Sequence, residues 1–286
     1  MAIKIENLSY TYMKDTPFEK NALDNINLEI KKGEFVAIIG HTGCGKSTLI
    51  QHFNGLLKPE EGKIYINGEL VNDSNIKEMR KKVGLVFQYP EYQLFETTVY
   101  KDIAFGIKSE KLSKEEEYER VKSALLKTGL TEDLLEKSIY DLSGGQKRRV
   151  AIAGIIVMDP EILVLDEPAA GLDPAGRDEI LGFAKKLRDE SGITIILVSH
   201  SMEDVAKLAD KIIVMNDSTV EMIGTPREVF KNKNRLREIG LGVPQMAEVF
   251  DEIGKNLPDI GINTNIYTVE EATQEILRLL KKGGTV

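Results

Sequence analysis

The chain of 286 residues contains a single cysteine, Cys44, so no disulfide can form within it. Such sparse use of cysteine is typical of a reducing compartment such as the cytosol. No uninterrupted apolar run approaches the ~18 residues that suggest a membrane-spanning helix. The first dozen residues, MAIKIENLSYTY, contain no apolar core of a signal peptide. We therefore expect the chain to reach a membrane only by docking onto another protein.

An excess of positive charge is also missing. The 38 Lys and Arg residues are outnumbered by 46 Asp and Glu residues, which gives a formal net charge of −8. Nucleic-acid-binding proteins usually carry a basic footprint, so this balance argues against nucleic acid as a partner. A hydrophobic share of 42% and a charged share of 29% fit a globular chain with a real core.

Apolar, β-rich runs alternate with helical patterns along most of the chain. This alternation predicts an α/β fold with a mainly parallel core sheet. The pattern of residues 22–30 and the Asn67-Gly68 turn predict additional antiparallel strands. The buried parallel strands are predicted at 35–40, 83–88, 162–167 and 193–200, a final hairpin-like pair at about 211–224, and helices at 47–57, 113–128, 132–137, 144–158 and 174–190.

The composition changes after about Gly224, where three prolines and several short amphipathic segments follow. The last of these segments, VEEATQEILRLLKK, has the pattern of a helix. We interpret the end of the chain as a small C-terminal appendage whose fold the sequence does not specify.

A glycine-rich loop joins the predicted strand 35–40 to the helix that follows it. The loop matches the pattern G-x-x-x-x-G-K-[ST] in the strand-to-helix context that this phosphate-binding motif requires. Its glycines let the main-chain N–H groups surround a phosphate at the positive end of the helix. Lys46 is expected to reach the β- and γ-phosphates, and the Ser47 hydroxyl to bind Mg²⁺. The loop and the adjoining donor are Gly40, His41, Thr42, Gly43, Cys44, Gly45, Lys46, Ser47 and Thr48.

Two acidic residues end the buried strand at 162–167. They lie at the carboxyl edge of the predicted sheet, where ligands bind in doubly wound folds. We expect Asp166 to hold Mg²⁺, and Glu167 to act as the general base that polarises the attacking water.

A second helix start has the features of an anion site. Ser143 and Gln146 have the spacing of a capping box, and Gly144 and Gly145 leave the first N–H groups of the helix uncovered. By itself this segment is better explained as an ordinary capped helix. Within a dimer, it could close on the nucleotide of the partner.

Together these motifs resemble the ATP-binding-cassette (ABC) ATPases over roughly residues 1–230. The phosphate loop, Gln88, the LSGGQ signature at 142–146, ILVLDE, Gly171-Leu172-Asp173 and Ser199-His200 occur in the order of that family. The resemblance implies a P-loop NTPase core with an antiparallel β subdomain and a helical signature subdomain at about 89–160. It also implies two cassettes stacked head to tail, with ATP between the phosphate loop of one and the signature of the other.

The resemblance assigns roles to further residues. Tyr12 would stack on adenine, and Gln88 would touch Mg²⁺ and the attacking water. Asp173 would organise the dimer seam, and His200 would contact the γ-phosphate. Ser143, Gly144, Gly145 and Gln146 would face the opposite ATP site. His41 and His52 are given no catalytic role.

The segment QYPEYQLF at 88–95 and the stretch AGLDPAGRDEIL at 170–181 resemble the energy-coupling-factor (ECF) importers. The segment FETTV at 95–99, with the cassette as a whole, favours the second ATPase of that group, the A-prime subunit. This group imports a vitamin or a transition-metal ion through a membrane T component and a substrate-capturing S component. Residues 231–286 would be the tail that helps to pair the two ATPases, and 88–106 the surface that docks the T component. The implied place is the cytoplasmic face of the membrane.

Other functions share part of this pattern. The ATPase of another importer or exporter has the same chemistry with a different membrane partner, and an isolated homodimer is an alternative to an A/A-prime pair. A soluble cassette protein that acts on nucleic acid or ribosomes is a minority interpretation, because the chain has one cassette and is acidic. A P-loop kinase or GTPase does not explain LSGGQ.

Cys44 lies among N–H groups that bind phosphate at a helix start, so we expect its thiol pKa to be lowered. A maleimide should then inactivate the protein, and ATP should protect it.

Overall fold

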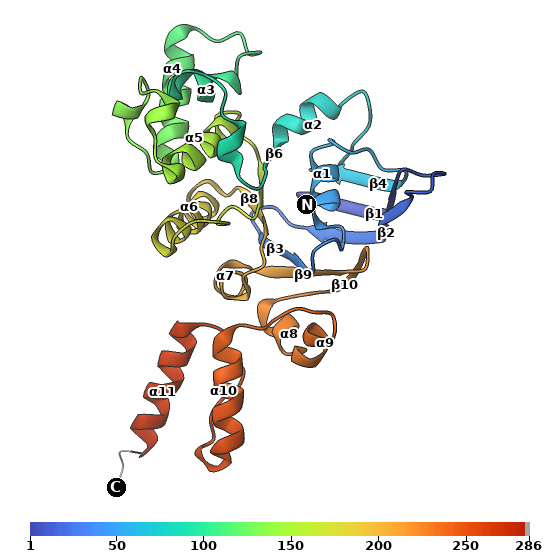
Figure 1. Ribbon diagram of the computed structural model, residues 1–286, viewed down its shortest axis with the longest axis vertical. Helices are drawn as coiled ribbons and strands as arrows, with labels where there is room; N and C mark the ends of the chain where they lie inside the picture. Colours follow the sequence, from blue (N-terminus) through green and yellow to red (C-terminus); the bar gives the residue numbers. More distant parts are fainter. Residues whose placement is uncertain (284–286) are drawn as a thin grey trace.

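A six-stranded sheet forms the centre of the computed structural model, which describes residues 1–283 (Figure 1). Its order is β10-β9-β3-β8-β7-β6, and all neighbouring strands are parallel except the β9–β10 hairpin. Every residue of β3 and β8 is buried, as expected of parallel strands covered on both faces. The strands are β3 (Phe35–Gly40), β6 (Val83–Val86), β7 (Ile162–Asp166), β8 (Thr194–Val198), β9 (Lys211–Asn216) and β10 (Thr219–Gly224).

A second, antiparallel sheet lies beside the first in the order β2-β1-β4-β5. Its strands are β1 (Ile3–Tyr12), β2 (Lys20–Ile30), β4 (Glu61–Ile66) and β5 (Glu69–Leu70). The predicted turn at Asn67 and Gly68 is confirmed, with positive φ at both residues. Helix α1 (Lys46–Phe53) packs between the sheets, and its Leu49, Ile50 and Phe53 share a core cluster with residues of both. The apolar contacts of α1 therefore fix the phosphate loop against both sheets.

A helical subdomain stands above the central sheet in Figure 1. Helices α3 and α4 pack against α5, and their apolar faces share one core cluster with β7 and β8. Its elements are α3 (Val99–Phe105), α4 (Lys114–Lys127), η2 (Glu132–Leu134), η3 (Ile139–Asp141) and α5 (Gly144–Ile156), and the segments α2 (Ile76–Lys82) and η1 (Pro90–Gln93) lead into it. The predicted antiparallel and helical subdomains are thus both present.

Two predicted helices are shorter than expected. At 132–137 only the 3₁₀ turn η2 forms, because the Leu135 and Lys137 carbonyls accept hydrogen bonds from the first amides of α3. Those carbonyls are therefore not available to a continuing helix. The helix predicted at 47–57 ends at Phe53, where Gly55 takes a φ of 68° and the Leu56 and Leu57 amides bond back to Gln51.

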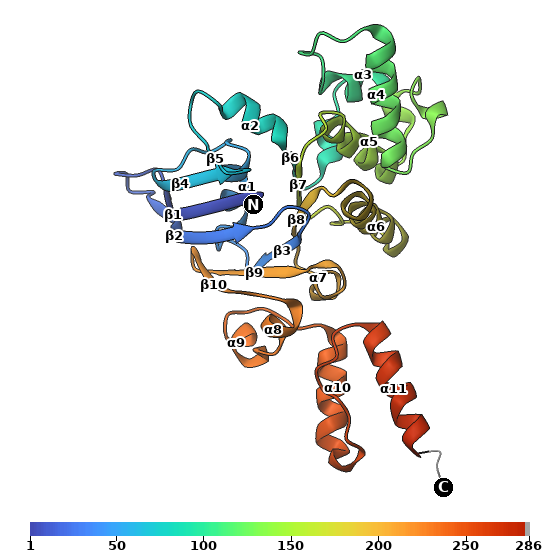
Figure 2. The same cartoon turned by 180° about the vertical axis from the view of Figure 1, so that it is seen from behind.

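The C-terminal part begins on the central sheet and then leaves it. Phe230, Leu236 and Ala247 share a core cluster with Ile212 and Val214 of β9. Beyond them, α10 and α11 project from the body as a pair (Figures 1 and 2). The remaining elements are α6 (Pro174–Ser191), α7 (Met202–Leu208), α8 (Pro226–Phe230), α9 (Lys233–Glu238), α10 (Gln245–Asn256), η4 (Pro258–Ile260) and α11 (Val269–Gly283).

Within residues 1–283, no helix combines the length and the apolar character that crossing a membrane requires.

Candidate functional site

The loops that follow four parallel strands meet at one edge of the central sheet. The phosphate loop follows β3 and Gln88 follows β6. Asp166 is the last residue of β7, Glu167 comes directly after it, and His200 follows β8. Because β3, β8 and β7 are adjacent, these segments surround one cleft of 530 Å³. Its lining is Tyr12, Lys20, Ala22, Thr42, Gly43, Gly45, Lys46, Ser47, Thr48, Gln88, Asp166, Glu167, Ala170, Val198 and His200.

The phosphate loop is held by its own lysine. The Nζ atom of Lys46 donates to the carbonyl oxygens of Gly40 at 2.7 Å and His41 at 2.9 Å, and the side chain is buried. Gly45 has a φ of 101°, and a Cβ there would lie 2.3 Å from the Ala22 oxygen. Only glycine fits this position without displacing β2. The loop is therefore held in place beside the cleft at the start of α1.

The structure contradicts the lowered pKa that the sequence predicted for the thiol of Cys44. Its side chain is 1% exposed, and burial raises the thiol pKa, although Lys46 acts in the opposite direction. The motif predicted only the nearby N–H groups and could not reveal that the side chain turns inward. Sγ lies 3.9 Å from the Nζ of Lys46, which is a packing position in the core cluster around α1.

Oxygen donors suited to Mg²⁺ come together at the base of the cleft. Burial raises the pKa of Asp166, while the charge of Lys46 and a hydrogen bond from the Ser47 hydroxyl act to lower it. A carboxylate, a hydroxyl and the exposed amide of Gln88 are hard ligands of the type that Mg²⁺ binds beside a phosphate. Within residues 1–283, no group of three His, Cys, Asp or Glu side chains could hold a metal. The donors present therefore fit an ion that is shared with a nucleotide.

Glu167 and His200 lie close together in the cleft. Burial, reinforced by the charge of Asp166, raises the pKa of Glu167 to about 7. The Nε2 atom of His200 lies 3.5 Å from Oε1 of Glu167, and burial together with Lys46 lowers the pKa of His200. A carboxyl group that titrates near neutral pH is suited to accept a proton from water.

Tyr12 lies at the opposite end of the cleft, on the last residue of β1. Its hydroxyl is 3.3 Å from Oγ1 of Thr48, and its ring meets the Tyr10 ring edge to face at 5.0 Å. The β1–β2 pairing sets Lys20 directly opposite Tyr12. The sequence did not single out Lys20 as a residue of the cleft. The register of the β1–β2 pair, which places Lys20 beside Tyr12, is the signal that could have identified it.

Gly40, His41 and Cys44 belong to the phosphate loop but do not line the cleft, and five further predicted residues lie outside both the loop and the cleft. Ser143 caps α5 and forms the predicted capping box with Gln146. A Cβ at Gly144 or Gly145 would meet nothing within 4 Å, so the start of this helix is open. Asp173 caps α6 by accepting from the Gly176 amide at 2.7 Å. One chain therefore does not bring the LSGGQ segment to its own phosphate loop.

The other two histidines, His41 and His52, make contacts within the chain. His52 is fully buried, and its Nδ1 lies 2.8 Å from the Thr48 oxygen. His41 belongs to the loop itself, with Nε2 at 3.5 Å from Asp217 of the β9–β10 turn.

Arg148 is a buried residue of α5 that the sequence did not single out. Its side chain is 2% exposed and contacts both the segment after Gln88 and the segment after Glu167. An arginine between Lys147 and Arg149 gives no sequence signal of burial.

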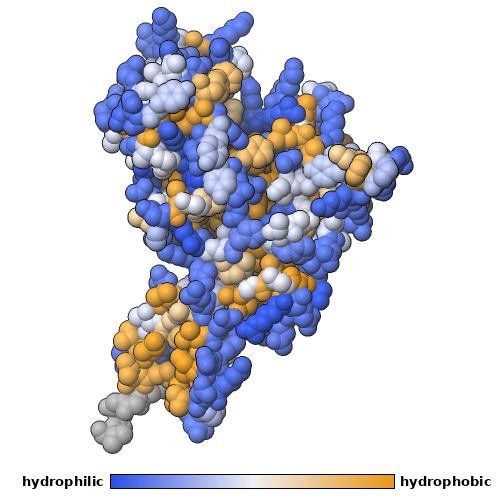
Figure 3. All heavy atoms as spheres, viewed as in Figure 1, coloured by the Kyte–Doolittle hydropathy of each residue, from blue (hydrophilic) through white to orange (hydrophobic). Residues whose placement is uncertain are grey.

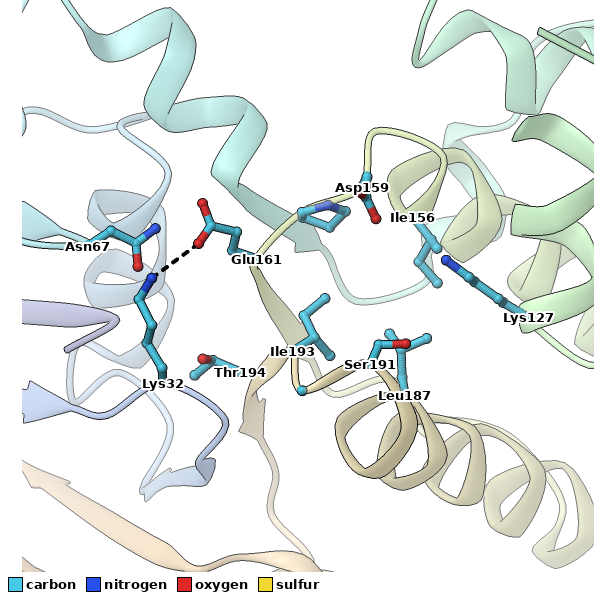
Figure 4. Close-up of a pocket in the computed structure, with 12 residues that line it drawn as sticks. Lys32, Asn67, Lys127, Ile156, Asp159, Glu161, Leu187, Ser191, Ile193 and Thr194 are labelled. Carbon is cyan, nitrogen blue, oxygen red and sulfur yellow. Dashed lines mark hydrogen bonds and ion pairs between the residues drawn. The ribbon is translucent and has the colours of Figure 1, made fainter. Parts of the chain in front are cut away.

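A separate hollow of 290 Å³ lies at the amino ends of β7 and β8, away from the cleft (Figure 4). An ion pair between Lys32 and Glu161, 3.4 Å apart, crosses it beside Asn67 and Thr194. None of the predicted site residues lines it.

The chain matches a family model described as ABC transporter over residues 23–170. It is 56% identical over 282 residues to the energy-coupling factor transporter ATP-binding protein EcfA2 of Acetivibrio thermocellus, covering 99% of this chain and 100% of the relative. It is 57% identical over 284 residues to the protein of the same name from Clostridium acetobutylicum, covering 98% and 99% of the two chains.

Solved structures agree with these relatives. CbiO1 of Clostridium perfringens, described as part of the ABC transporter complex CbiONQ, matches with a TM-score of 0.75 and 42% identity. That match covers 91% of this chain and 97% of CbiO1. A dimeric ATP-binding cassette in a post-hydrolysis state, bound to ADP and phosphate, matches with a TM-score of 0.70 and 33% identity, covering 78% and 98%.

Proposed function

The chain belongs to the ABC transporter family of ATPases, and from this premise we propose that it is the A-prime ATP-binding subunit of an ECF importer. The observation that carries the ATPase activity is the single cleft that joins Lys46, Ser47, Asp166 and Glu167. Full-length relatives with the ECF name support the transporter group.

The roles of the side chains follow from their positions. Lys46 and the N–H groups of residues 40–48 bind the phosphates, and Tyr12 stacks on the adenine. Ser47, Asp166 and Gln88 would hold Mg²⁺, which neutralises phosphate charge. Glu167 accepts the proton of the attacking water, and His200 contacts the γ-phosphate.

The LSGGQ segment acts on the ATP of a second cassette. Its open helix start is suited to a phosphate, yet it lies outside the cleft of its own chain. Residues 143–146 therefore complete the partner's site, and Asp173 lies at the seam. The solved cassette that is dimeric with bound ADP and phosphate supports pairing of this kind. In the cell the partner is the other ATPase of an A/A-prime pair, and the isolated chain can form a homodimer.

The nucleotide-binding domain comprises residues 1–230, and residues 231–286 form a dimerisation appendage. The two projecting helices carry exposed apolar side chains toward one surface (Figure 3), which supports a role in pairing. Residues 284–286 of the appendage lie outside the described part of the chain.

The T component docks on residues 88–106. Tyr92 is 83% exposed, Phe95 59% and Phe105 49%, so these rings do not fill the local core. Phe95 and Phe105 meet edge to face at 4.8 Å and form an exposed apolar pair within this segment. A membrane partner at this surface would place the chain at the cytoplasmic face of the membrane. The cargo, a vitamin or transition-metal ion, is captured by an S component and does not contact this chain.

A pull-down from detergent-solubilised native membranes tests the proposal. With this chain as bait, we expect mass spectrometry to identify a second cassette ATPase, a polytopic T component and small S proteins. A bait with Tyr92→Ala and Phe95→Ala should keep the second ATPase and lose the T component.

The alternatives give different eluates. An importer or exporter of another group would yield a membrane domain without S proteins. Soluble partners alone, even under conditions that trap ATP, would contradict the transporter proposal and favour a soluble cassette protein.

A further inference from the structure

A single buried guanidinium connects the segment after Gln88 to the segment after Glu167. Arg148 projects from α5, and its Nε and Nη2 atoms donate to the two oxygens of Glu91 at 2.9 and 2.6 Å. Its Nη1 atom donates to the carbonyl oxygens of Pro168 at 3.0 Å and Ala170 at 2.7 Å. The side chain thus contacts η1 on one side and the loop after β7 on the other.

Both connected segments contain a residue in a left-handed backbone conformation. Glu167 has a φ of 48° and Tyr89 a φ of 56°. Such conformations are costly for residues other than glycine and persist where the surroundings hold them. The centre of the Tyr89 ring lies 5.7 Å from the guanidinium carbon of Arg148. The main-chain amide of Ala170 donates to the main-chain carbonyl oxygen of Glu167 at 3.0 Å. Arg148 therefore touches the immediate surroundings of both residues.

The chemistry of the contact requires arginine. A planar guanidinium can bind one carboxylate through two of its nitrogens and still donate the two N–H groups of the third nitrogen to two carbonyls. A lysine ammonium, in contrast, is a point charge. Burial raises the pKa of Glu91, but the hydrogen bonds and charge of Arg148, together with a main-chain hydrogen bond, outweigh burial and keep this pKa below its usual value. Glu91 is therefore an ionised partner at neutral pH.

We propose that Arg148 is a positioning residue that ties the position of η1 to that of Glu167. A shift of η1 moves Glu91, and with it the guanidinium that holds the Pro168 and Ala170 carbonyls. The carboxylate of Glu167 then leaves its place in the cleft while the phosphate loop remains intact. The inference rests on the proposed function in one respect, the use of Glu167 in hydrolysis.

Steady-state hydrolysis by the co-purified transporter complex tests this role. For Arg148→Lys we expect kcat to fall about 10- to 100-fold, because small displacements of a catalytic group cost this much, while KM for ATP stays within about twofold. The conservative lysine should not rescue turnover, since it lacks the fork. Unchanged kcat, or a loss confined to KM, would overturn the proposal.

A matched control comes from the same subdomain. Arg120 donates to Glu110 and to the Val157 carbonyl at the far end of α5, so it pairs a carboxylate and a carbonyl in the same way. Arg120→Lys should leave kcat within about twofold. An equal loss in both variants would show that any lysine replacement in this subdomain lowers turnover, and would also overturn the proposal.

Hydrogen exchange on the full-length chain provides a readout that needs no partner. Arg148→Lys should speed exchange in the peptides over 88–93 and 167–171 together, and Arg120→Lys in neither. If the lysine variant fails to fold, Glu91→Gln keeps the shape and removes the charge, and the same two peptides should respond. If exchange does not change in either peptide, Arg148 does not link them.

The two proposals fail in different ways. A wild-type complex that contains no membrane protein would contradict the importer role, yet exchange in 88–93 and 167–171 would still decide the role of Arg148.

Discussion

The two neighbouring carboxylates at the end of β7, those of Asp166 and Glu167, have different surroundings in the cleft. Asp166 faces Lys46 and the Ser47 hydroxyl, which oppose the effect of its burial. Glu167 is more strongly shifted, to a pKa of about 7, by burial and the charge of Asp166. The difference suits one residue to hold a cation and the other to exchange a proton.

Replacing Glu167 by glutamine should separate binding from hydrolysis. The amide keeps the shape of the side chain but cannot accept a proton, so we expect turnover to fall about 10²–10⁴-fold. Affinity for ATP, measured with a fluorescent nucleotide, should be retained.

The matched variant is Lys46→Ala, which removes a phosphate ligand and should reduce ATP binding itself. Near-normal turnover in Glu167→Gln would remove this residue from the role of base.

The burial of Cys44 predicts slow modification. Because it is the only cysteine, every maleimide adduct reports on this thiol. With the pKa raised and 1% exposure, labelling of the folded chain should be slow at pH 7 and should keep rising above pH ~8.5, where an ordinary thiol is already half ionised.

The urea-unfolded chain is the control and should label rapidly. The fold favours the neutral form of the Cys44 thiol. The free energy of unfolding is therefore unaffected by this thiol below the pKa that it has in the unfolded chain, and decreases as pH rises above that pKa. Rapid labelling of the folded protein at pH 7 would contradict the buried placement.

Two helices of the helical subdomain begin with the same capping box. In α4, Ser113 accepts from the Glu116 amide at 3.2 Å, and Glu116 accepts from the Ser113 amide at 2.8 Å. In α5, Ser143 and Gln146 make the equivalent bonds at 3.3 and 3.0 Å. Only the second box adjoins the proposed seam between cassettes.

The pair allows stability and function to be separated. Ser113→Ala and Ser143→Ala should each lower the free energy of unfolding by about 1 kcal/mol, the usual cost of losing a cap. Only Ser143→Ala should also lower ATP turnover in the dimer. Equal turnover in the two variants would contradict the role of Ser143 across the seam.

The two caps should also differ in their response to acid. The main-chain hydrogen bond from Ser113 lowers the pKa of Glu116. The stabilisation by this cap is therefore complete above the pKa of Glu116 in the unfolded chain, and it is lost as pH falls through the pKa of Glu116 in the folded chain. The cap on α5 uses the neutral Gln146. Circular dichroism of Glu116→Ala and Gln146→Ala between neutral and acidic pH should show that only the destabilisation caused by Glu116→Ala becomes smaller in acid.

The sequence predicted the elements with continuous or periodic patterns and the residues of the phosphate motif. Strands β3, β7 and β8 each contain a continuous apolar run, so the sequence predicted them as buried strands, although it did not predict their order in the sheet. Helices α8 and α9 have five and six residues and are fixed by contacts with β9, which no local pattern shows. The burial of Arg148 and Cys44 depends on packing between distant segments and was not predictable either.

On the scale of the whole molecule, the projecting helices leave a large apolar surface exposed. The exposed side chains include Ile276 at 48%, Leu277 at 51% and Leu280 at 66% on α11, with Val249 on α10 and Leu257 just after it. Surfaces of this kind on a folded chain mark sites of association.

Ile276→Glu combined with Leu280→Glu should weaken pairing of the two ATPases by about 100-fold or more, because burial of one such side chain contributes about 1.5–3 kcal/mol. Analytical ultracentrifugation of the paired subunits would measure this change. A control on another face of α11 compares single changes: Leu280→Glu should weaken pairing, whereas Gln274→Glu, at an exposed polar position outside the apolar face, should have little effect. Equal weakening by Leu280→Glu and Gln274→Glu would indicate a general effect of charge.

The order of the central sheet also constrains how the chain is synthesised and folded. Strand β3 lies between β8 and β9, so the phosphate loop at residues 40–47 has its complete neighbours only after residue 215 has been made. Contacts between such distant segments form late, because the loop between them must close first. On the ribosome, the first half of the chain would therefore emerge without a formed nucleotide cleft. Capture of ATP by a nascent chain would then mark the moment when the central sheet closes.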